Sequence, residues 1–229
     1  MKVSYTVIET VSGKFVDVSN PKVETIDGHD IAWALSREPR FCGHTISALP
    51  YTVGQHSMKV ADIVHDVFVP GEVREAALRY FTDHKTLDTN VLEVLKSSHP
   101  GPVQPAIQLF ALLHDASEAY LRDLPSPVKN LPGLKEAYEA VEAKMMRAIH
   151  EKFSLDLMSP RDQAVAQQLT HWADIYARTI EAYHLMPSRG AHWNSTQAVT
   201  LRGLQQFQEP QPSLQVYEDF LNYLNGLVL

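Results

Sequence analysis

Apolar residues recur at helical spacing through most of the chain. This periodicity predicts helices over about 29–38, 53–68, 72–81, 90–98, 106–121, 134–153, 160–185 and 213–227. The helix from residue 53 shows the stripe most clearly, with Val53, Val60, Ile63, Val64 and Val67 on one face. Punctuating residues support these bounds: Asp27 can cap a helix start, Pro39 and Pro70-Gly71 stop helices, and Pro160 suits a first turn.

The remaining segments are predicted to be a hairpin and loops. Two short β-leaning runs, SYTVIETV and KFVDV, flank Ser12-Gly13 and indicate an N-terminal hairpin. RFCGHTISALPYT and the Pro-punctuated DLPSPVKNLPG are typical of loops, and HPGPVQP breaks the chain before residue 106. We expect one all-α domain over 1–229 with a small β-hairpin. Its core spans about 27–195, with a helical insertion at about 71–105 and a C-terminal helix at about 213–227.

Composition excludes several classes of protein. The 229 residues carry 20 Lys+Arg against 27 Asp+Glu, a net charge of −7, which argues against binding to a nucleic-acid polymer. One cysteine, Cys42, excludes a disulfide framework. No apolar run reaches the roughly 18 residues of a membrane span, and the N-terminus has no apolar signal region. We therefore expect a cytoplasmic protein without a membrane partner.

Histidines that lie next to carboxylates indicate where a metal or catalytic site could be. His114 and Asp115 lie in the most apolar predicted helix, where an ionised aspartate needs a partner or a metal. Glu118 follows at helical spacing, so the three residues are expected to share one face. A lone His-Asp pair is more often a capping or salt-bridged cluster. Here His56, on an earlier helix, and Asp174, amid apolar neighbours on a later one, extend the set to two imidazoles and two carboxylates suited to a divalent ion.

The order H…HD…D on helices resembles the HD-domain metal-dependent phosphohydrolases. HDASEAYLRDLPSPVKN, with the preceding ALL, is similar to the subgroup that contains the bacterial 5′-deoxynucleotidases and the phage dATP triphosphohydrolases. The blocks RFCGHT…YTVGQHS and ADIYARTIEA…HW resemble the same subgroup. The resemblance covers about residues 27 to 195.

This resemblance implies roles for individual residues. His56, His114, Asp115 and Asp174 would hold one divalent ion, whose identity among Mn, Co, Fe, Ni, Mg and Zn stays open. Glu118 would orient or deprotonate the attacking water. Asp123 matches a second acidic position that assists the water or a second metal near Glu118, and equally suits a turn before Leu124-Pro125.

Cationic and aromatic residues are expected to meet the substrate. Arg40 matches a substrate-contacting arginine of the 5′-deoxynucleotidases, and Phe41 stands where those enzymes carry a tryptophan that helps to exclude a 2′-hydroxyl. His44, in GHT, is a candidate phosphate contact or general acid, with a loop histidine hydrogen-bonded to the backbone as the alternative. Lys129 is a candidate phosphate contact and equally a solvated surface lysine. Trp193 is expected to pack rather than react.

The sequence therefore predicts a metal-dependent phosphohydrolase of (deoxy)nucleotides, either a 5′-(deoxy)nucleotidase or a dNTP triphosphohydrolase. The resemblance also implies a homo-oligomer. Alternatives are an HD-type phosphodiesterase or alarmone hydrolase, and a non-catalytic nucleotide-binding HD module. A structural protein without a ligand is less expected, because burying a histidine-carboxylate cluster costs free energy that no bound ligand would offset.

Overall fold

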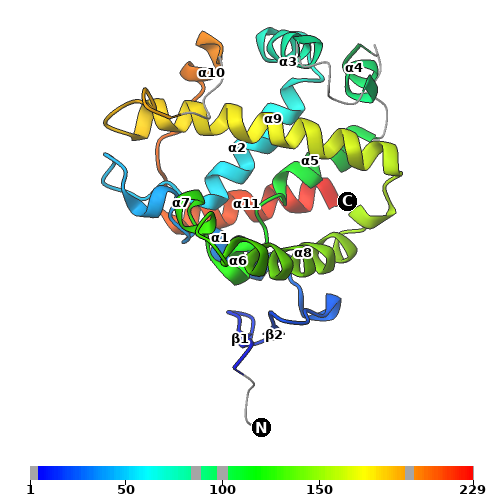
Figure 1. Cartoon of the computed structure of the whole chain (residues 1–229), viewed down its shortest axis with the longest axis vertical. Helices are drawn as coiled ribbons and strands as arrows, with labels where there is room; N and C mark the ends of the chain where they lie inside the picture. The colour runs from blue at the N-terminus through cyan, green and yellow to red at the C-terminus, as the bar shows by residue number, and fades with distance from the viewer. Residues whose placement is uncertain (1–4, 84–88, 97–102, 194–198, 229) are drawn as a thin grey trace.

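The computed structural model describes residues 5–83, 89–96, 103–193 and 199–228. Within them the chain is almost entirely helical, which confirms the predicted all-α class (Figure 1). The helices are α1 (Gly28–Leu35), α2 (Val53–Asp66), α3 (Glu72–Asp83), α4 (Thr89–Lys96), α5 (Val103–Leu112), α6 (Glu118–Leu121), α7 (Ser126–Lys129), α8 (Lys135–Lys152), α9 (Pro160–Leu185), α10 (Leu201–Gln205) and α11 (Ser213–Val228). Three 3₁₀ turns are η1 (Val23–Thr25), η2 (Arg40–Gly43) and η3 (Leu155–Leu157).

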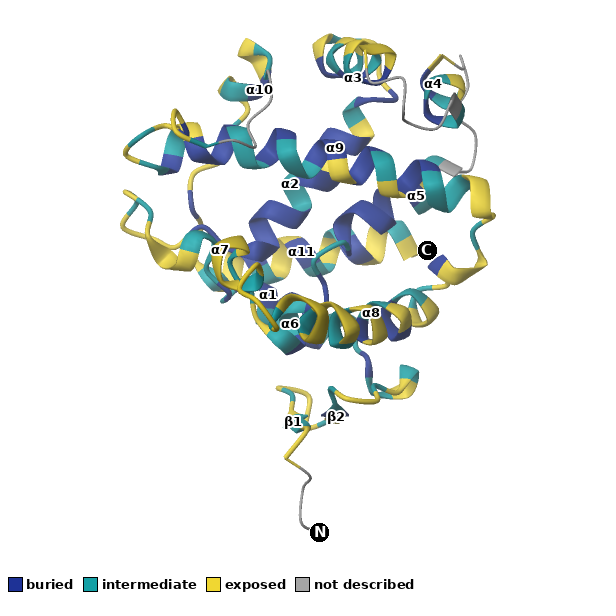
Figure 2. Cartoon of the chain, in the orientation of Figure 1, coloured by how far each residue is buried: buried dark blue, intermediate teal, exposed yellow. Residues whose placement is uncertain are grey.

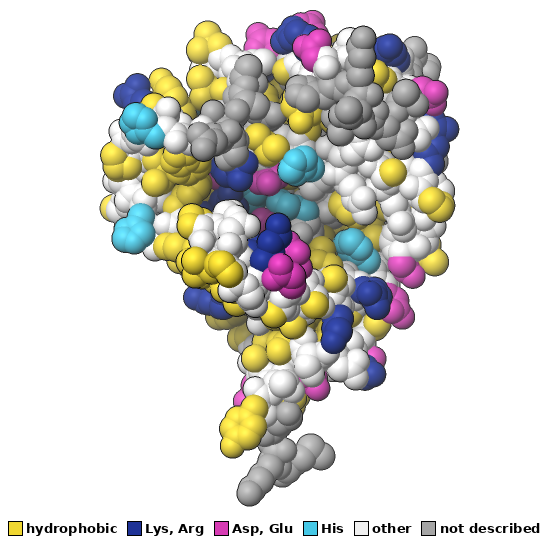
Figure 3. Space-filling model, in the orientation of Figure 1, with side chains coloured by type: hydrophobic (Ala, Val, Ile, Leu, Met, Phe, Trp, Pro, Cys, Tyr) yellow, Lys and Arg dark blue, Asp and Glu magenta, His cyan; other side chains and the backbone are white. Residues whose placement is uncertain are grey.

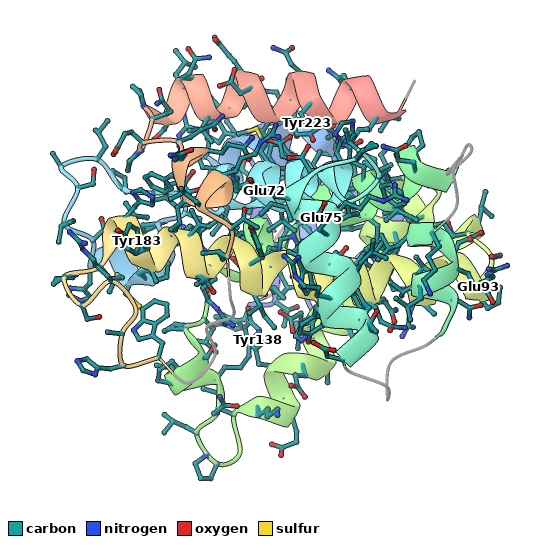
Figure 4. The ribbon with its side chains drawn as sticks, turned by 90° about the horizontal axis from the view of Figure 1, so that it is seen from above. Glu72, Glu75, Glu93, Tyr138, Tyr183 and Tyr223 are labelled. Carbon is teal, nitrogen blue, oxygen red and sulfur yellow. The ribbon has the colours of Figure 1, made fainter. Side chains whose placement is uncertain are left out.

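Helices α2, α5 and α9 pack against one another and form the centre of the molecule. Their facing sides are the most continuously buried surfaces (Figure 2). Helix α11 closes one side by packing on α1, α2 and α5, and Tyr223 points inward from it to donate to Asp62 Oδ1 at 2.7 Å (Figure 4). Tyr138 of α8 lies on the opposite side of that view. The two small helices α3 and α4 pack on each other and on the outer ends of α2 and α9.

The predicted hairpin is present as β1 (Val7–Glu9) and β2 (Phe15–Asp17), which pair antiparallel. Gly13 turns the chain with a φ of +80°, a conformation that glycine adopts without strain. Two hydrogen bonds tie the hairpin to α1: Ser12 N and Oγ donate to Asp30 Oδ1 and Oδ2 at 3.0 and 2.7 Å. The hairpin projects from the helical body (Figure 1), and it reaches the hydrophobic core through Val16 of β2, which is completely buried.

Most predicted helices are present, and their ends have local causes. Asp27 accepts from His29 N at the start of α1, and Ser159 accepts from Asp162 N at the start of α9, where Pro160 occupies the first position. Part of the predicted break before residue 106 lies outside the described residues. α5 already begins at Val103, because Pro105 falls in the first turn, where its missing N–H is not needed. The short helices α7 and α10 form in segments predicted to be loops.

The predicted continuous helix over 106–121 is wrong. α5 ends at Leu112, a series of turns follows, and α6 begins at Glu118. The Ala111 carbonyl explains the break, because it accepts from both N and Nδ1 of His114, at 3.4 and 2.7 Å. In a continuous α-helix the Ala111 carbonyl would instead accept from the N–H of Asp115, so the two bonds to His114 replace that helical hydrogen bond. Contacts between residues three apart follow, including Glu118 N to Asp115 O at 3.0 Å.

Candidate active site

The site lies where the first turn of α2, the turns after α5 and the middle of α9 meet. Figure 3 shows histidine, acidic and basic side chains gathered in a hollow on the face below α9. His56 is completely buried in the first turn of α2, where Thr52 caps the helix by accepting from Gln55 N. His114 and Asp115 come from the turns after α5, and Asp174 comes from α9.

Four of the predicted residues lie close together. His56 Nε2 is 3.2 Å from Asp174 Oδ1 and 3.7 Å from Asp115 Oδ2, and His114 Nε2 is 3.2 Å from Asp115 Oδ2. Ligand atoms of His56, His114 and Asp115 all lie within 4.8 Å of one another. Two ligands with bonds of about 2.1 Å at a right angle around one ion would be about 3 Å apart, close to these separations.

The residues present fit a divalent cation. The Nε2 atoms of His56 and His114 are both buried without a hydrogen-bond partner. Their Nδ1 atoms are already occupied, one by Glu181 Oε1 at 2.7 Å and the other by the Ala111 carbonyl at 2.7 Å. Metal-binding histidines are held in the same way, with one nitrogen on a protein acceptor and the other on the ion. The donor set of imidazole and carboxylate suits a divalent ion such as Mn²⁺, Co²⁺, Fe²⁺, Ni²⁺, Mg²⁺ or Zn²⁺.

The electrostatics of the cluster also favour a cation. Burial opposes ionisation of Asp115 and Asp174, but the neighbouring imidazoles outweigh it and lower the pKa of both carboxyls. Burial and Arg40 lower the pKa of His56, and the carboxylates of Glu181 and Asp174 overcome them to raise it to about 9. The two carboxylates therefore stay ionised because positive charge lies next to them. A divalent ion would supply more positive charge at this place than a protonated imidazole does.

Glu118 and Asp123 border the cluster as acidic residues with raised pKa values. Burial is the largest cause for Glu118, followed by the charges of Asp115 and Asp123. One oxygen of Glu118, Oε2, is buried without a hydrogen-bond partner. Burial also raises the pKa of Asp123, whose backbone N–H donates to Glu38 Oε1 at 3.3 Å. Glu118 is thus available to take a hydrogen bond or a proton from a molecule in the hollow.

Arg40 approaches the cluster from the loop between α1 and α2. The neck of this loop is closed by backbone hydrogen bonds, from Arg40 N to Tyr51 O and from Val53 N to Glu38 O, both at 2.9 Å. Its side chain is only 11% exposed; Nε donates to Glu181 Oε2 at 3.0 Å, and Nη1 lies 3.8 Å from Asp115 Oδ2. A buried cation beside the acidic cluster can bind a phosphoryl oxygen there.

Phe41 and Cys42 follow with φ values of +55° and +52°, which cost non-glycine residues about 1–2 kcal/mol each. Such strain is typical of functional loops. The Phe41 ring lies 5.3 Å from the Arg40 guanidinium carbon and 5.7 Å from the Trp193 ring, so Trp193 packs as expected, but at the border of the site. His44 is exposed at the end of this turn, and it takes no part in the ion pairs that join the four cluster residues.

Lys129 lies at the end of α7 and is held by α8. Its Nζ is 3.1 Å from Glu142 Oε1 and 4.6 Å from the centre of the Tyr138 ring. The Lys129 charge also lowers the pKa of Glu118 and Asp123, after the larger contributions of burial and nearby charges. It is therefore a partly buried, paired lysine near the acidic border, rather than a freely solvated one.

Glu181 is a site residue that sequence reasoning missed. Its carboxylate is completely buried and contacts both His56 and Arg40. A signal was available, because Glu181 follows Asp174 by two helical turns and therefore shares its face of α9. An acidic residue inside that apolar stripe needs a partner, as Asp174 does.

Comparison with known proteins places the chain among nucleotide hydrolases. The family described as 5′-deoxynucleotidase YfbR-like matches residues 89–223. The chain belongs to this family. The YfbR-like family implies an HD-type nucleotide phosphohydrolase with a small-molecule substrate, and such proteins usually bind a divalent metal. The match includes α5 to α9 and most of α11, so it extends past residue 195, where the resemblance found in the sequence ends. It begins after Arg40 and His56, so it does not cover these two residues.

Two relatives are similar over most of the chain. An uncharacterized protein of Rhodobacter capsulatus is 26% identical over 172 residues, which are 75% of this chain and 69% of the relative. The uncharacterized Escherichia coli protein YfdR is 26% identical over 186 residues, 81% of this chain and 76% of YfdR. In the described part of the chain, none of the helices has the length and apolarity that crossing a membrane requires.

Proposed function

We propose that this protein is a metal-dependent 5′-nucleotidase that hydrolyses nucleoside 5′-monophosphates to nucleoside and phosphate. The observation that carries the proposal is that two buried imidazole nitrogens, which make no hydrogen bond in the structure, face two carboxylates directly beside a buried arginine. The YfbR-like family supports the same reaction class. We retain His56, His114, Asp115 and Asp174 as the proposed metal ligands.

The proposed chemistry divides between the ion and the side chains around it. When bound, a divalent cation supplies Lewis-acid polarisation of a phosphoryl oxygen and of water. Glu118 accepts a proton from the attacking water, because its buried carboxylate has an oxygen without a partner. Arg40 binds the phosphoryl oxygens of the substrate through charge-assisted hydrogen bonds. The second acidic residue, Asp123, supports Glu118, and Lys129 and His44 are proposed as outer phosphate contacts.

Phe41 and Trp193 support a nucleotide over a simple phosphate ester. Their rings are 5.7 Å apart, and the Phe41 ring also contacts the Arg40 guanidinium. A sugar or base bound beside Arg40 would therefore meet an aromatic wall. The wall has phenylalanine where the related 5′-deoxynucleotidases have tryptophan, so we propose weaker discrimination against ribonucleotides.

Product analysis tests the proposal. The protein, loaded with Mn²⁺ or Co²⁺, is incubated with dAMP, AMP, dATP or ATP, and the products are separated by chromatography. We expect nucleoside and orthophosphate from the monophosphates, loss of turnover in Glu118→Gln, and full turnover in Glu218→Gln, which changes an exposed glutamate of α11.

The alternatives give different products. Intact triphosphate released from dATP, without turnover of dAMP, would show a dNTP triphosphohydrolase instead. Absence of turnover with all four nucleotides, in protein shown to hold the metal, would contradict both and favour a phosphodiesterase, an alarmone hydrolase or a binding module. Sedimentation analysis of the same sample tests the expected homo-oligomer.

A further inference from the structure

The carboxylate of Glu181 joins two parts of the proposed site that come from different elements. Oε1 lies 2.7 Å from Nδ1 of His56 in α2, and Oε2 accepts from Nε of Arg40 in η2 at 3.0 Å. The carboxylate is completely buried, so neither contact is exchanged with solvent. Each oxygen of this single group thus has a different functional partner.

The contact with His56 determines which ring nitrogen faces the cluster. Because Glu181 Oε1 accepts from Nδ1, the hydrogen is held on Nδ1 when the ring is neutral, and the lone pair of Nε2 points toward Asp174 and Asp115. Loss of such a partner typically weakens metal binding by about 10–100-fold.

The contact with Arg40 determines where the guanidinium lies. Arg40 Nε is held by Glu181, and Nη1 is directed toward Asp115, at 3.8 Å. The Nε and Nη groups of a guanidinium are rigidly connected, so fixing one edge orients the other. Without Glu181, the Arg40 side chain would lose the hydrogen bond that holds its Nε in place.

We propose that Glu181 is a positioning residue that couples metal binding to phosphate binding, by orienting the His56 imidazole and the Arg40 guanidinium with one carboxylate. This inference rests on the proposed function, because it needs a metal at His56 and a phosphate at Arg40. It goes further in assigning the geometry of both to one buried residue of α9. Glu181 touches neither ligand itself.

The test measures binding of Co²⁺ and of inorganic phosphate by calorimetry, independently of turnover. We expect Glu181→Gln to weaken Co²⁺ binding by about 10–100-fold. Phosphate should also bind the Co²⁺-loaded variant at least fivefold more weakly, because the neutral amide has a single oxygen and cannot accept from both His56 Nδ1 and Arg40 Nε. Glu218→Gln, on the surface of α11, should change neither affinity. Circular dichroism of each variant confirms the fold.

A merely structural role predicts another pattern. Folded Glu181→Gln with wild-type affinity for either Co²⁺ or phosphate would overturn the coupling. If Glu181→Gln does not fold, Glu181→Asp replaces it, because the shorter acid keeps the charge but cannot span both partners. Unchanged affinity for both ligands would then overturn the inference. We expect Glu181→Asp to retain more Co²⁺ affinity than Glu181→Gln. A wild-type protein that binds both ligands but hydrolyses no nucleotide would contradict the proposed function alone.

Discussion

The guanidinium of Arg40 lies against the carboxylate of Asp115, with Nη1 3.8 Å from Oδ2. The distance is longer than a hydrogen bond, so the two charges attract each other without being locked together. A phosphoryl oxygen bound to a cation at Asp115 would therefore lie within reach of the same guanidinium. This neighbourhood connects the proposed metal ligands to the proposed substrate contacts.

Substitution of Arg40 should act mainly on substrate binding. Hydrogen bonds to charged groups contribute about 1.5–3 kcal/mol, so we expect Arg40→Gln to raise KM for dAMP by roughly 10- to 150-fold. Arg40→Lys should recover only part of this, since lysine lacks the planar fork. Steady-state kinetics measure both. Arg161→Gln is the control, because Arg161 pairs with Glu93 on the surface; an equal effect there would contradict a local role for Arg40.

Glu118→Gln should separate catalysis from metal binding. Loss of a general base typically lowers kcat by about 10²- to 10⁴-fold. Metal affinity should change only a few-fold, because the imidazoles of His56 and His114 have their short contacts with Asp115 and Asp174 and not with Glu118. Single-turnover kinetics and Co²⁺ titration report the two quantities. A variant that loses Co²⁺ binding together with activity would place Glu118 among the ligands instead.

Metal binding should stabilise the folded protein. A cation at 100 times its Kd adds about 2.7 kcal/mol to the free energy of unfolding, so Co²⁺ or Mn²⁺ should raise Tm of the wild type. His114→Ala should remove this increase. His65→Ala should keep it, although His65-Asp66 repeats the same dipeptide, because His65 is half exposed and outside the cluster. Differential scanning calorimetry with and without metal provides the comparison, and a metal-dependent rise retained in His114→Ala would count against the assigned ligand.

Phe41→Trp should increase discrimination between deoxyribose and ribose. The larger ring restores the aromatic residue of the related 5′-deoxynucleotidases at a position already next to Arg40 and Trp193. We expect the ratio of kcat/KM for dAMP over AMP to rise several-fold, mostly through a larger KM for AMP. Phe41→Leu removes the ring and should not raise this ratio. Similar ratios in wild type and Phe41→Trp would remove Phe41 from sugar recognition.

His150 should make stability sensitive to mild acid. Burial beside Phe110 lowers its pKa from the ordinary value, so the folded state disfavours the protonated ring. The unfolded chain therefore binds the proton more readily once pH falls through about 6.5. We expect the free energy of unfolding to decrease from pH 7 to 5, and to decrease less in His150→Gln. Urea titrations at both pH values measure this; the exposed His171→Gln should behave as wild type, and parallel curves for wild type and His150→Gln would refute the assignment.

The sequence predicts much of the helical framework because the buried face of a helix requires apolar residues at regular spacing along the chain. Each long helix has one apolar face, and capping residues such as Asp27 and Ser159 act locally, so both signals are contained in short segments. The break after Leu112 was not predictable in this way. It depends on a side chain, His114, competing for the carbonyl of Ala111.

The sequence indicates which types of residue form the candidate site, but not which of these side chains contact one another. Paired histidines and carboxylates on apolar helices already indicate a cation. The contacts from Glu181 to His56 and Arg40 depend on how α9 lies across α2, and the contact of Phe41 with Trp193 depends on the path of two loops. Such tertiary relationships leave no periodic signal in a single sequence.

The wide separation of the site residues along the chain has a consequence for folding. His56 and Glu181 are 125 positions apart, so their contact forms only after α2 and α9 have docked across most of the polypeptide. Contacts of such high sequence separation are slow to form because a long loop must close first. A cation shared by α2 and α9 would then hold this loop closed like a reversible cross-link. Its capture would mark the point at which α2, the turns after α5 and α9 have come together, before α11 is needed.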